Sequence, residues 1–537
     1  MPVILLATAP PPAVGLTRTT TADIVVYGGT PAGVLAAVTA KRAEPRLEVV
    51  LVEPGLNLGG MISNGLGWTD TGDPATTGGY ARELLDRIAA LEGLPSGQWH
   101  FEPHTAELAF EAMAREAGVV VRYGQRLDQA AGSVAMNGTQ IVSLRMTDGS
   151  TYAARTFVDA SYEGDLLAGA GVSYALGREP ASKYGESMAG VRPAVPVVTL
   201  PAGVALPVDS GAPGPLGSGD TRTQDMTYRL CFSSDSANKV PFAMPPGYAA
   251  SAYDSVLDYI VERVLLNGRL PRLDWVIFLA PLPNRKFDVN SWGLMSSSLT
   301  GAAYDYTELP YAQRAVVEAR HRSWAEGLLY FLRYDPRVPA SIRSELGRYG
   351  LCRDEFVNNG NWPRLLYVRE GRRMIGQVVL RQADVTDTPA KPDIIGVGSY
   401  RIDAHQVSRW MDADRNVWAE GSLSARSQRY AIPYRIMVPS AAEATNLLVP
   451  VAVSVSHVAQ ASLRMEPEYM IMGEAAGEAA AMTIGISTQL VNGTAVEHRT
   501  VTNVGDVSVA LLQARLRAHG AYLVEPQRTG RRHGAVG

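Results

Sequence analysis

The stretch DIVVYGGTPAGVLAAV, residues 23–38, decides the fold class of this chain. Its short apolar run Ile24–Tyr27 is typical of a strand buried inside a parallel sheet. Gly28 and Gly29 end that run, and Pro31 follows where the fixed φ and missing N–H of proline suit the first position of a helix. The stretch therefore predicts a strand, a tight turn and a helix in close succession.

A second apolar run, Val49–Val52, follows this helix and stops at Glu53. Two buried strands joined by a helix form a βαβ unit. Further on, residues 143–159 alternate between apolar and polar side chains around a turn, which indicates antiparallel strands that lead back to the parallel sheet. The fold class that we predict is α/β. It consists of a Rossmann-like domain, with a parallel sheet and an antiparallel β insertion, and a mixed α+β substrate or cap domain.

The turn after the first strand carries part of the GxGxxG dinucleotide fingerprint. Its sequence GGTPAG, residues 28–33, has the first and third glycines, but Thr30 replaces the second. That glycine normally lets the backbone approach a diphosphate, so Thr30 must either lean away or contribute its hydroxyl. Glu53 ends the next strand, where a carboxylate accepts ribose hydroxyls, and the helix N-terminus offers N–H groups to a diphosphate. The dinucleotide-binding residues that we predict here are Gly28, Gly29, Thr30, Pro31, Ala32, Gly33, Glu53 and Pro54.

Further glycines favour FAD over NAD. Gly59, Gly60 and Met61 follow shortly after the ribose-binding acid, and the glycine-rich residues 65–68 come next. Glycines at these positions let the backbone pass close to a long cofactor. The cofactor that we expect is therefore FAD.

Several blocks of sequence resemble one protein family. The blocks are LGGM at 58–61, DASYEGD at 159–165, LLYF at 328–331, LYVRE at 366–370, DAH at 403–405, IPYR at 432–435 and the segment 456–477. The chain resembles the bacterial FAD-dependent oxidoreductase family, a branch of the glutathione-reductase-like flavoproteins, over nearly its whole length. The resemblance implies an FAD-binding domain, a mixed-sheet substrate domain and, for many members, secretion and a link with carbohydrate breakdown.

The resemblance also implies where the cofactor binds. The turn at 28–33 matches the diphosphate site, Glu53 the ribose acid, and residues 59–61 the segment that passes the flavin ribityl chain. In this family the strand end at 159–165 returns to the cofactor, and residues 464–477 close over the flavin with a second helix N-terminus. The cofactor-binding residues expected from these last two segments are Ala160, Ser161, Gly164, Asp165, Arg464, Met465, Gly473 and Ala476.

The candidate catalytic residues follow from what a flavin needs. It accepts a hydride at N5, so the protein must take a proton from the substrate and stabilise negative charge on the reduced flavin. His457 and His405 are the candidate bases, with His457 preferred, because imidazole titrates near neutral pH. Arg464 is the candidate for stabilising the flavin anion or a diphosphate oxygen. Tyr434 and Arg435 are expected to anchor a polar substrate, although a structural ion pair explains Arg435 nearly as well.

The length of 537 residues predicts two or three domains, one of them discontinuous. Residues 1–22 are expected to be disordered or signal-like, so that the protein is either cytoplasmic or exported. The FAD-binding domain is expected at 23–190 and again at 401–490, with the substrate or cap domain at 191–400. Residues 491–537 are expected to form a C-terminal helix and a disordered tail.

Composition argues against several kinds of partner. The chain has 49 basic and 53 acidic residues without a basic stripe, so nothing indicates nucleic-acid binding, and no apolar run is long enough to cross a membrane. Cys231 and Cys352 are too far apart in sequence for a CxxC pair and are expected to be buried, reduced thiols. No metal site is expected, since Pro103 breaks the helix that His100 and His104 would have to share.

The function that we predict is hydride transfer between the flavin N5 and a small polar substrate, such as a carbohydrate derivative. The electrons then pass to oxygen or to a soluble acceptor. Two alternatives stay open. One is a flavin-dependent reductase of C=C bonds, and the other is a catalytically silent carbohydrate-binding protein that keeps FAD for its structure.

Overall fold

The protein is built around a five-stranded parallel sheet. The computed structural model describes residues 18–491 and 494–524. The strand order is β23-β8-β2-β3-β4, and every neighbouring pair runs parallel. The strands are β2 (Ile24–Tyr27), β3 (Val49–Val52), β4 (Val120–Arg122), β8 (Thr156–Asp159) and β23 (Leu447–Leu448). The predicted α/β fold with a parallel sheet is thereby confirmed.

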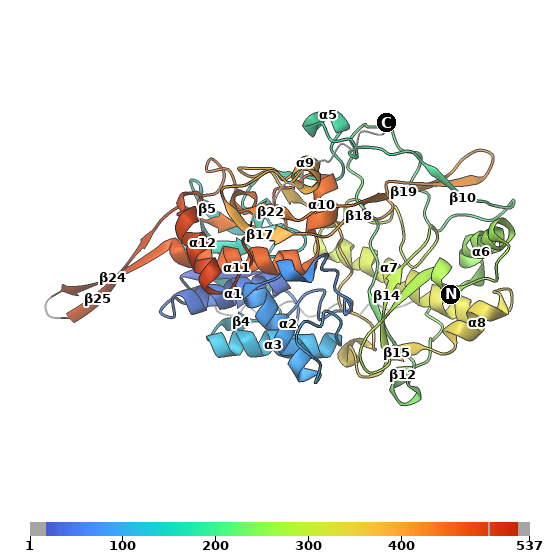
Figure 1. Cartoon of the computed structure of the whole chain (residues 1–537), viewed down its shortest axis with the longest axis horizontal. Coiled ribbons are helices and arrows are strands. Elements are labelled where there is room, and N and C mark those ends of the chain that lie inside the picture. The colour runs from blue at the N-terminus through green and yellow to red at the C-terminus, as the bar shows by residue number, and fades with distance from the viewer. Residues whose placement is uncertain (1–17, 492–493, 525–537) are drawn as a thin grey trace, which may run out of the picture.

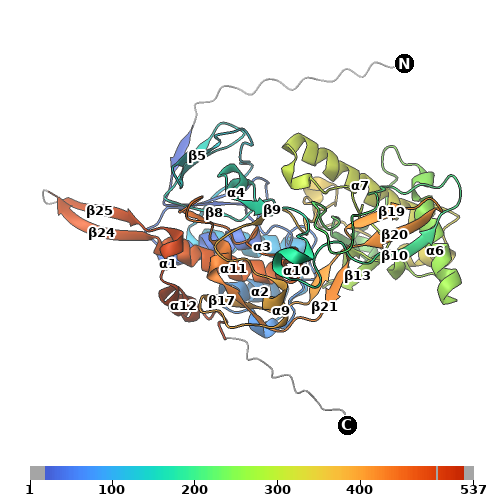
Figure 2. The same ribbon diagram turned by 90° about the horizontal axis from the view of Figure 1, so that it is seen from above.

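Alternate side chains of the central strand β2 face two different layers. Ile24 and Val26 pack with helices, whereas Val25 and Tyr27 pack with a second sheet. Figure 2 shows the helices and this second sheet, which contains β5, on opposite sides of β8. The helices are α1 (Pro31–Ala43), α2 (Gly79–Leu91), α3 (Pro103–Ala117) and α11 (Glu466–Met482). The second sheet consists of β1 (Thr19–Thr21), β7 (Thr151–Ala153), β6 (Gln140–Arg145) and β5 (Val134–Asn137), in this order. The parallel sheet is therefore covered on both faces.

The second sheet is the predicted antiparallel insertion, and it corrects the expected start of the domain. β1 pairs in parallel with β7, so residues 18–22 belong to the folded domain and are not a disordered or signal-like segment. No sequence pattern indicates this strand, because consecutive threonines show no alternation of apolar and polar side chains. Residues 1–17, which the same prediction included, lie outside the described part of the chain.

Helices α1 and α11 pack closely against each other. A Cβ atom at Gly473 would collide with the backbone of Ala32, and one at Gly477 would collide with the backbone of Ala36. Glycine at both positions therefore lets the two helix backbones approach. This contact fixes the amino ends of α1 and α11 relative to each other.

A second hydrophobic core forms the other lobe of the molecule, in the green and yellow part of Figure 1. Its antiparallel sheet has the order β12-β15-β11-β14-β13, and a smaller sheet has the order β10-β20-β19. The strands of the larger sheet are β11 (Leu230–Ser233), β12 (Lys239–Val240), β13 (Ile277–Pro281), β14 (Lys286–Ser291) and β15 (Gly350–Cys352). Those of the smaller sheet are β10 (Val195–Thr199), β19 (Ser408–Met411) and β20 (Asn416–Glu420). The helices of this lobe are α6 (Asp254–Asn267), α7 (Tyr311–Tyr334) and α8 (Ala340–Leu346). We call this part the cap lobe.

The chain passes between the two cores more than once. Val385 in α9 (Gln382–Thr386) and Ile395 in β17 (Ile394–Gly398) precede residue 400, yet both belong to the first core. Val417 of β20 comes after residue 401 and belongs to the cap core. Short strand pairs also form, namely β9 (Tyr174–Ala175) with β16 (Arg373–Met374), β17 with β22 (Tyr430–Pro433), and β18 (Ile402–Ala404) with β21 (Leu423–Ala425). The cap lobe therefore draws on both sides of the boundary expected at residue 400.

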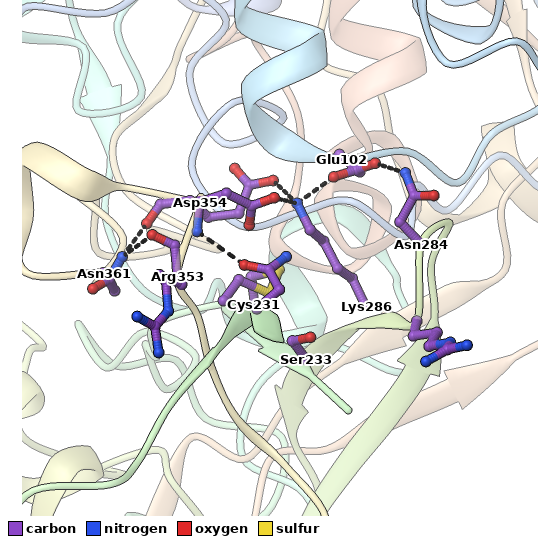
Figure 3. The surroundings of a disulfide bond; sticks show 12 residues. Glu102, Cys231, Ser233, Asn284, Lys286, Arg353, Asp354 and Asn361 are labelled. Carbon is purple, nitrogen blue, oxygen red and sulfur yellow. Dashed lines mark hydrogen bonds and ion pairs between the residues drawn. A yellow bond between two sulfur atoms is a disulfide. The ribbon is translucent and has the colours of Figure 1, made fainter. Parts of the chain in front are cut away.

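The two cysteines form a disulfide, so the expectation of reduced thiols was wrong. Cys231 lies in β11 and Cys352 in β15, which are neighbouring antiparallel strands, and their Cα atoms are 5.5 Å apart (Figure 3). That spacing is ordinary for a disulfide. The strand pairing that brings the cysteines together spans 121 residues of sequence, and the spacing of the two cysteines gives no hint of it.

The C-terminal region contains a hairpin that the sequence did not reveal. β24 (Ile484–Val491) and β25 (Thr494–Val501) pair antiparallel and project from the molecule (Figure 1). The helix α12 (Val509–Ala518) follows, where a C-terminal helix was expected. Residues 525–537, for which a disordered tail was predicted, are outside the described residues. No described helix is both long and apolar enough to cross a membrane.

Candidate functional site

A cavity of about 400 Å³ lies between the two lobes. On one side it is lined by Gly28, Glu53 and Ser161, which follow the carboxyl ends of β2, β3 and β8. On the other side it is lined by cap residues that include Arg314 of α7 and Leu366. Ligands of open α/β sheets bind at this edge of the sheet. The cavity is therefore where the sequence predicted a dinucleotide.

The glycine turn at the amino end of α1 leaves no room for side chains. Gly28 has a φ of +101°, and a Cβ atom there would lie 2.8 Å from the carbonyl carbon of Ala160. A Cβ atom at Gly33 would collide with the carbonyl group of Gly28. Both predicted glycines of the fingerprint are therefore required by the geometry of the turn.

Thr30 occupies the remaining glycine position of the fingerprint without strain. Its φ of −63° is available to any residue, and its side chain caps α1. The hydroxyl accepts a hydrogen bond from the N–H of Gly33 at 3.2 Å and donates one to the carbonyl of Ala160 at 2.7 Å. Thr30 thus turns its hydroxyl towards β8, while the residue itself still lines the cavity.

Glu53 is oriented by the same turn. One carboxylate oxygen accepts from the N–H of Gly29 at 2.6 Å, and the other accepts from the N–H of Gly55. Burial raises the pKa of Glu53 to about 7, although these two N–H groups oppose the shift. The carboxylate that the sequence assigned to the ribose is therefore fixed at the rim of the cavity and titrates near neutral pH.

Asn64 supplies an unused hydrogen-bond acceptor beside the cavity. Its side-chain amide donates to the carbonyl of Gly60 at 2.7 Å, and both residues line the cavity. Its Oδ1 is buried and has no partner within the described part of the chain. A buried acceptor in this state fits a ligand that brings hydroxyl groups, as the ribityl chain of FAD does. No sequence pattern singles out Asn64, although it follows the predicted Gly59-Gly60-Met61 segment by three residues.

The remaining rim of the cavity is made by ion pairs between the two lobes. Asp165, at the start of α4 (Asp165–Gly169), binds Arg314 at 2.7 and 2.8 Å and Arg372 at 2.9 Å. Burial alone would raise the pKa of Asp165, but the two arginines hold it below its ordinary value. Asp165 therefore lines the cavity, as expected, and at the same time ties α7 to the first domain.

The glycine turn, the fixed carboxylate and the free acceptor together describe a site for a dinucleotide with a hydroxylated chain. The sequence model for FAD dependent oxidoreductases matches residues 23–500 of this chain. The chain belongs to the FAD dependent oxidoreductase family. FAD is therefore its cofactor. A search of curated proteins found no match.

The similar solved structures match only part of this chain. THI4 of Thermovibrio ammonificans is 20% identical over 30% of this chain and 66% of its own, with a TM-score of 0.23. The amino acid oxidase NikD is 18% identical to this chain, with a TM-score of 0.22. The match covers 30% of this chain and 57% of NikD. L-proline dehydrogenase from P. horikoshii is 14% identical to this chain, with a TM-score of 0.23. The match covers 31% of this chain and 59% of the dehydrogenase. The chain spans less than two thirds of the length of each.

A chain of contacts leads from the cavity of this flavoprotein towards the cap. The hydroxyl of Tyr162 accepts from the N–H of Met61 at 2.9 Å and donates to Glu466 at 2.6 Å. Met61 packs with Leu66 and Tyr367, and Tyr162 contacts the same cluster. Glu466 is the first residue of α11, and burial raises its pKa to about 8. The predicted amino end of α11 therefore lies beside the Met61 segment.

Arg464 lies at the end of this chain of contacts. It is buried at the carboxyl end of α10 (His457–Leu463), and its guanidinium donates to the hydroxyl of Tyr367 and to the carbonyl of Asp403, each at 2.9 Å. No carboxylate oxygen of the described residues lies within 4 Å of it. A buried guanidinium without a carboxylate partner fits the predicted role of stabilising an anion.

His405 lies near Arg464 in the same region. Its side chain is 22% exposed, and Nδ1 is 3.6 Å from Asp225. Burial and the positive charges of Arg369, Arg464 and Arg229 put the pKa of His405 well below its ordinary value. The imidazole is therefore neutral at neutral pH.

His457 is buried at the first turn of α10 and is held by an acid. Its Nδ1 lies 2.8 Å from Glu370, which also pairs with Arg373. Burial alone would raise the pKa of Glu370, but His457 and Arg373 lower it, so the carboxylate accepts from Nδ1. Gln224 joins the two predicted histidines, since its amide donates to Glu370 at 3.4 Å and accepts from the N–H of His405 at 3.0 Å.

Tyr434 and Arg435 are not brought to the cavity. The ring of Tyr434 is part of the first core, and its hydroxyl donates to the carbonyl of Val504 at 2.8 Å. Arg435 is 46% exposed and pairs with Asp393 at 2.9 Å. Packing in the hydrophobic core accounts for Tyr434. A surface ion pair accounts for Arg435, which was the alternative given for it from the sequence.

The predicted cofactor residues fall into three groups. Those that line the cavity are Gly28, Thr30, Glu53, Pro54, Gly60, Ser161 and Asp165. Those that lie in the segments adjoining it are Gly29, Pro31, Ala32, Gly33, Gly59, Met61, Ala160, Gly164, Arg464 and Met465. Gly473 and Ala476 lie further along α11 in the first core, where Gly473 packs on Ala32. Helix packing accounts for these last two.

The acidic group near His104 holds a lysine. Glu102, His104 and Glu355 place their ligand atoms close together, as a metal site would. However, the ammonium of Lys286 lies against Glu102 and 2.7 Å from Glu355 (Figure 3). This cation neutralises the acids from inside the group. His100 does not join it and stacks on Trp68, with ring centroids 3.5 Å apart.

Proposed function

We propose that the protein transfers a hydride between a small polar substrate and N5 of its FAD. The observation that carries the proposal is the polar region around His405 and Arg464, which adjoins the Met61 end of the cavity through Tyr367. A flavin enzyme needs a proton acceptor and a cation close to the reacting ring. This region supplies a neutral imidazole and a buried guanidinium within one cluster.

The residues that would hold FAD are those of the glycine turn, Glu53, Asn64 and the Met61 segment. Bound there, FAD would supply reversible acceptance of a hydride. Glu53 would accept hydrogen bonds from the ribose hydroxyls, and the amino end of α1 would face the diphosphate. The oxygen Oδ1 of Asn64 would accept from a hydroxyl of the cofactor.

Within this proposal His405 takes the proton and His457 positions it, which reverses the preference drawn from the sequence. A base must be within reach of the substrate, and His405 is 22% exposed whereas His457 is 1% exposed. His457 acts through Glu370 and Gln224, whose side chain holds the backbone of His405. Arg464 would stabilise negative charge that develops during the transfer.

The test is a substrate screen followed by the absorbance of the flavin under anaerobic conditions. Hydroxylated molecules, with sugar derivatives among them, are expected to bleach the flavin if they are oxidised. If no donor bleaches it but chemically reduced protein is reoxidised by an activated alkene, the protein is a C=C reductase. If neither change occurs with any compound, the proposal of hydride transfer is wrong, and the catalytically silent alternative is favoured.

A further inference from the structure

Four arginines gather in the polar region between the lobes. Arg229, Arg369, Arg409 and Arg464 are each at most 5% exposed. Arg369 and Asp225 lie at the centre of this group. Arg369 binds Asp225 at 2.9 Å, and the nearby positive charges of Arg229 and Arg464 help to lower the pKa of Arg369. We call these four residues the arginine cluster.

Among the described residues, two members of the arginine cluster have a carboxylate partner. Arg229 forms two hydrogen bonds to Asp288, at 2.9 and 2.7 Å, and Arg369 binds Asp225. Within the described ranges, no carboxylate oxygen lies within 4 Å of Arg409 or Arg464. The guanidinium of Arg409 donates to the carbonyl of Leu294 at 3.0 Å. Asp70 and Asp403 influence Arg464 only from beyond 4 Å.

Several N–H groups of the cluster are unused. The Nε atoms of Arg369, Arg409 and Arg464 and the Nη2 atom of Arg409 are buried without a hydrogen-bond partner among the described residues. Burial lowers the pKa of Arg369 and of Arg409 to about 10, which shows how strongly their charges are desolvated. Buried charges are ordinarily paired through direct hydrogen bonds, and among the described residues Arg409 and Arg464 have no carboxylate close enough for one.

Two residues beside the cluster reach the surface. His405 adjoins it and is 22% exposed. Tyr400, which lies near Arg464, lines an open depression of about 480 Å³ on the molecular surface. Arg401 and Arg426 line the same depression, so the approach is positively charged.

We infer that the arginine cluster binds a carboxylate group of the substrate. The inference rests on the proposed function and names the substrate class as small hydroxylated carboxylic acids. A planar guanidinium matches the two oxygens of a carboxylate, and two guanidiniums of the cluster have no such partner. An anion bound here would also favour protonation of the adjacent His405.

The experiment compares acids with matched neutral compounds on the FAD-loaded protein. The pairs are D-gluconate with D-glucitol and L-lactate with L-lactamide, and the readouts are the flavin spectrum and the thermal midpoint. We expect an acid of these pairs to bind saturably and its neutral partner to bind at least about tenfold more weakly, as loss of a charge-assisted hydrogen bond predicts. Inorganic phosphate is included as a competing anion.

Variants locate the binding. Arg409→Met is expected to weaken acid binding by about tenfold or more, while Arg409→Lys retains part of it. Arg272→Met is the matched control, because Arg272 is 66% exposed and pairs with Asp274 at the surface. If Arg409→Met does not fold, competition between acid and phosphate in the unchanged protein still reports on the site.

The outcomes separate this inference from the proposed function. If neutral compounds bind and bleach the flavin while acids do not bind, hydride transfer stands and the carboxylate assignment is wrong. If phosphate binds as tightly as the acids and displaces them, the carboxylate assignment is also overturned. If acids bind and Arg409→Met abolishes their binding, but nothing reduces the flavin, the anion site stands and the proposed hydride transfer fails.

Discussion

The affinity for FAD should fall when the pH drops below about 7, because Glu53 then takes up a proton. Burial raises the pKa of this carboxyl group to about 7. Ribose hydroxyls donate to the carboxylate, so FAD binds the ionised form better. The affinity is therefore full above the raised pKa and is lost as the pH falls through it.

The size of the effect follows from the pKa. At about pH 6 roughly a tenth of the free protein carries an ionised Glu53, whereas at about pH 8 roughly nine tenths does. The dissociation constant for FAD should therefore be about tenfold higher at the lower pH. The assay is titration of apoprotein with FAD, followed by quenching of flavin fluorescence at constant ionic strength.

Two variants show whether Glu53 is responsible. Glu53→Gln removes the titrating group and places an amide where the N–H groups of Gly29 and Gly55 donate. This variant should bind FAD more weakly by about 1.5–3 kcal/mol, and its affinity for FAD should not depend on pH over this range. Glu48→Gln is the control, because Glu48 is exposed at the start of β3. The reasoning is refuted if the unchanged protein binds FAD equally at both pH values, or if Glu53→Gln keeps the pH dependence.

Other changes test the rest of the account. Gly33→Ala puts a Cβ atom against the carbonyl of Gly28 and should abolish FAD binding, measured by the flavin content of the purified protein. Cys231→Ala removes the disulfide and should lower the free energy of unfolding by about 2–4 kcal/mol in denaturant titrations, and an unchanged value would contradict the disulfide. His405→Gln should slow flavin reduction by about 10²–10⁴-fold in stopped-flow measurements with an identified substrate, and an unchanged rate would exclude it as the base. Gly477→Val should prevent the close packing of α11 on α1 and lower the thermal midpoint of the protein by several degrees, whereas an unchanged midpoint would contradict the packing described.

The adenosine end of the site could be predicted because its determinants are local in sequence. The turn that begins at Gly28, the helix that follows and Glu53 lie within one βαβ unit, so hydrophobic periodicity and glycine spacing were enough to find them. Thr30 was the one ambiguity. Its hydroxyl caps α1 and binds Ala160, a contact with β8 that no local pattern contains.

The substrate end could not be predicted because it depends on distant contacts. Arg229 directly precedes β11, Arg409 lies in β19, and Arg464 comes from the end of α10. Each arginine on its own is typical of a surface residue, and only the packing of the two lobes buries them together. The disulfide also depends on a distant contact, because only the pairing of β11 with β15 brings Cys231 to Cys352.

The two histidines show where a family resemblance is not sufficient. Both His405 and His457 were found by the sequence blocks that contain them, yet their exposure differs, and exposure follows from the tertiary structure. The network through Glu370 and Gln224 explains why both belong to one site. The sequence blocks therefore identify the two histidines, but only the tertiary structure shows which of them is exposed.

A crystal structure of the protein loaded with FAD tests the central claim most directly. We expect ribose hydroxyls within hydrogen-bonding distance of Glu53 and the diphosphate at the amino end of α1, next to Gly28 and Thr30. A cofactor whose adenosine lies elsewhere, with Glu53 making no contact to it, would contradict the account.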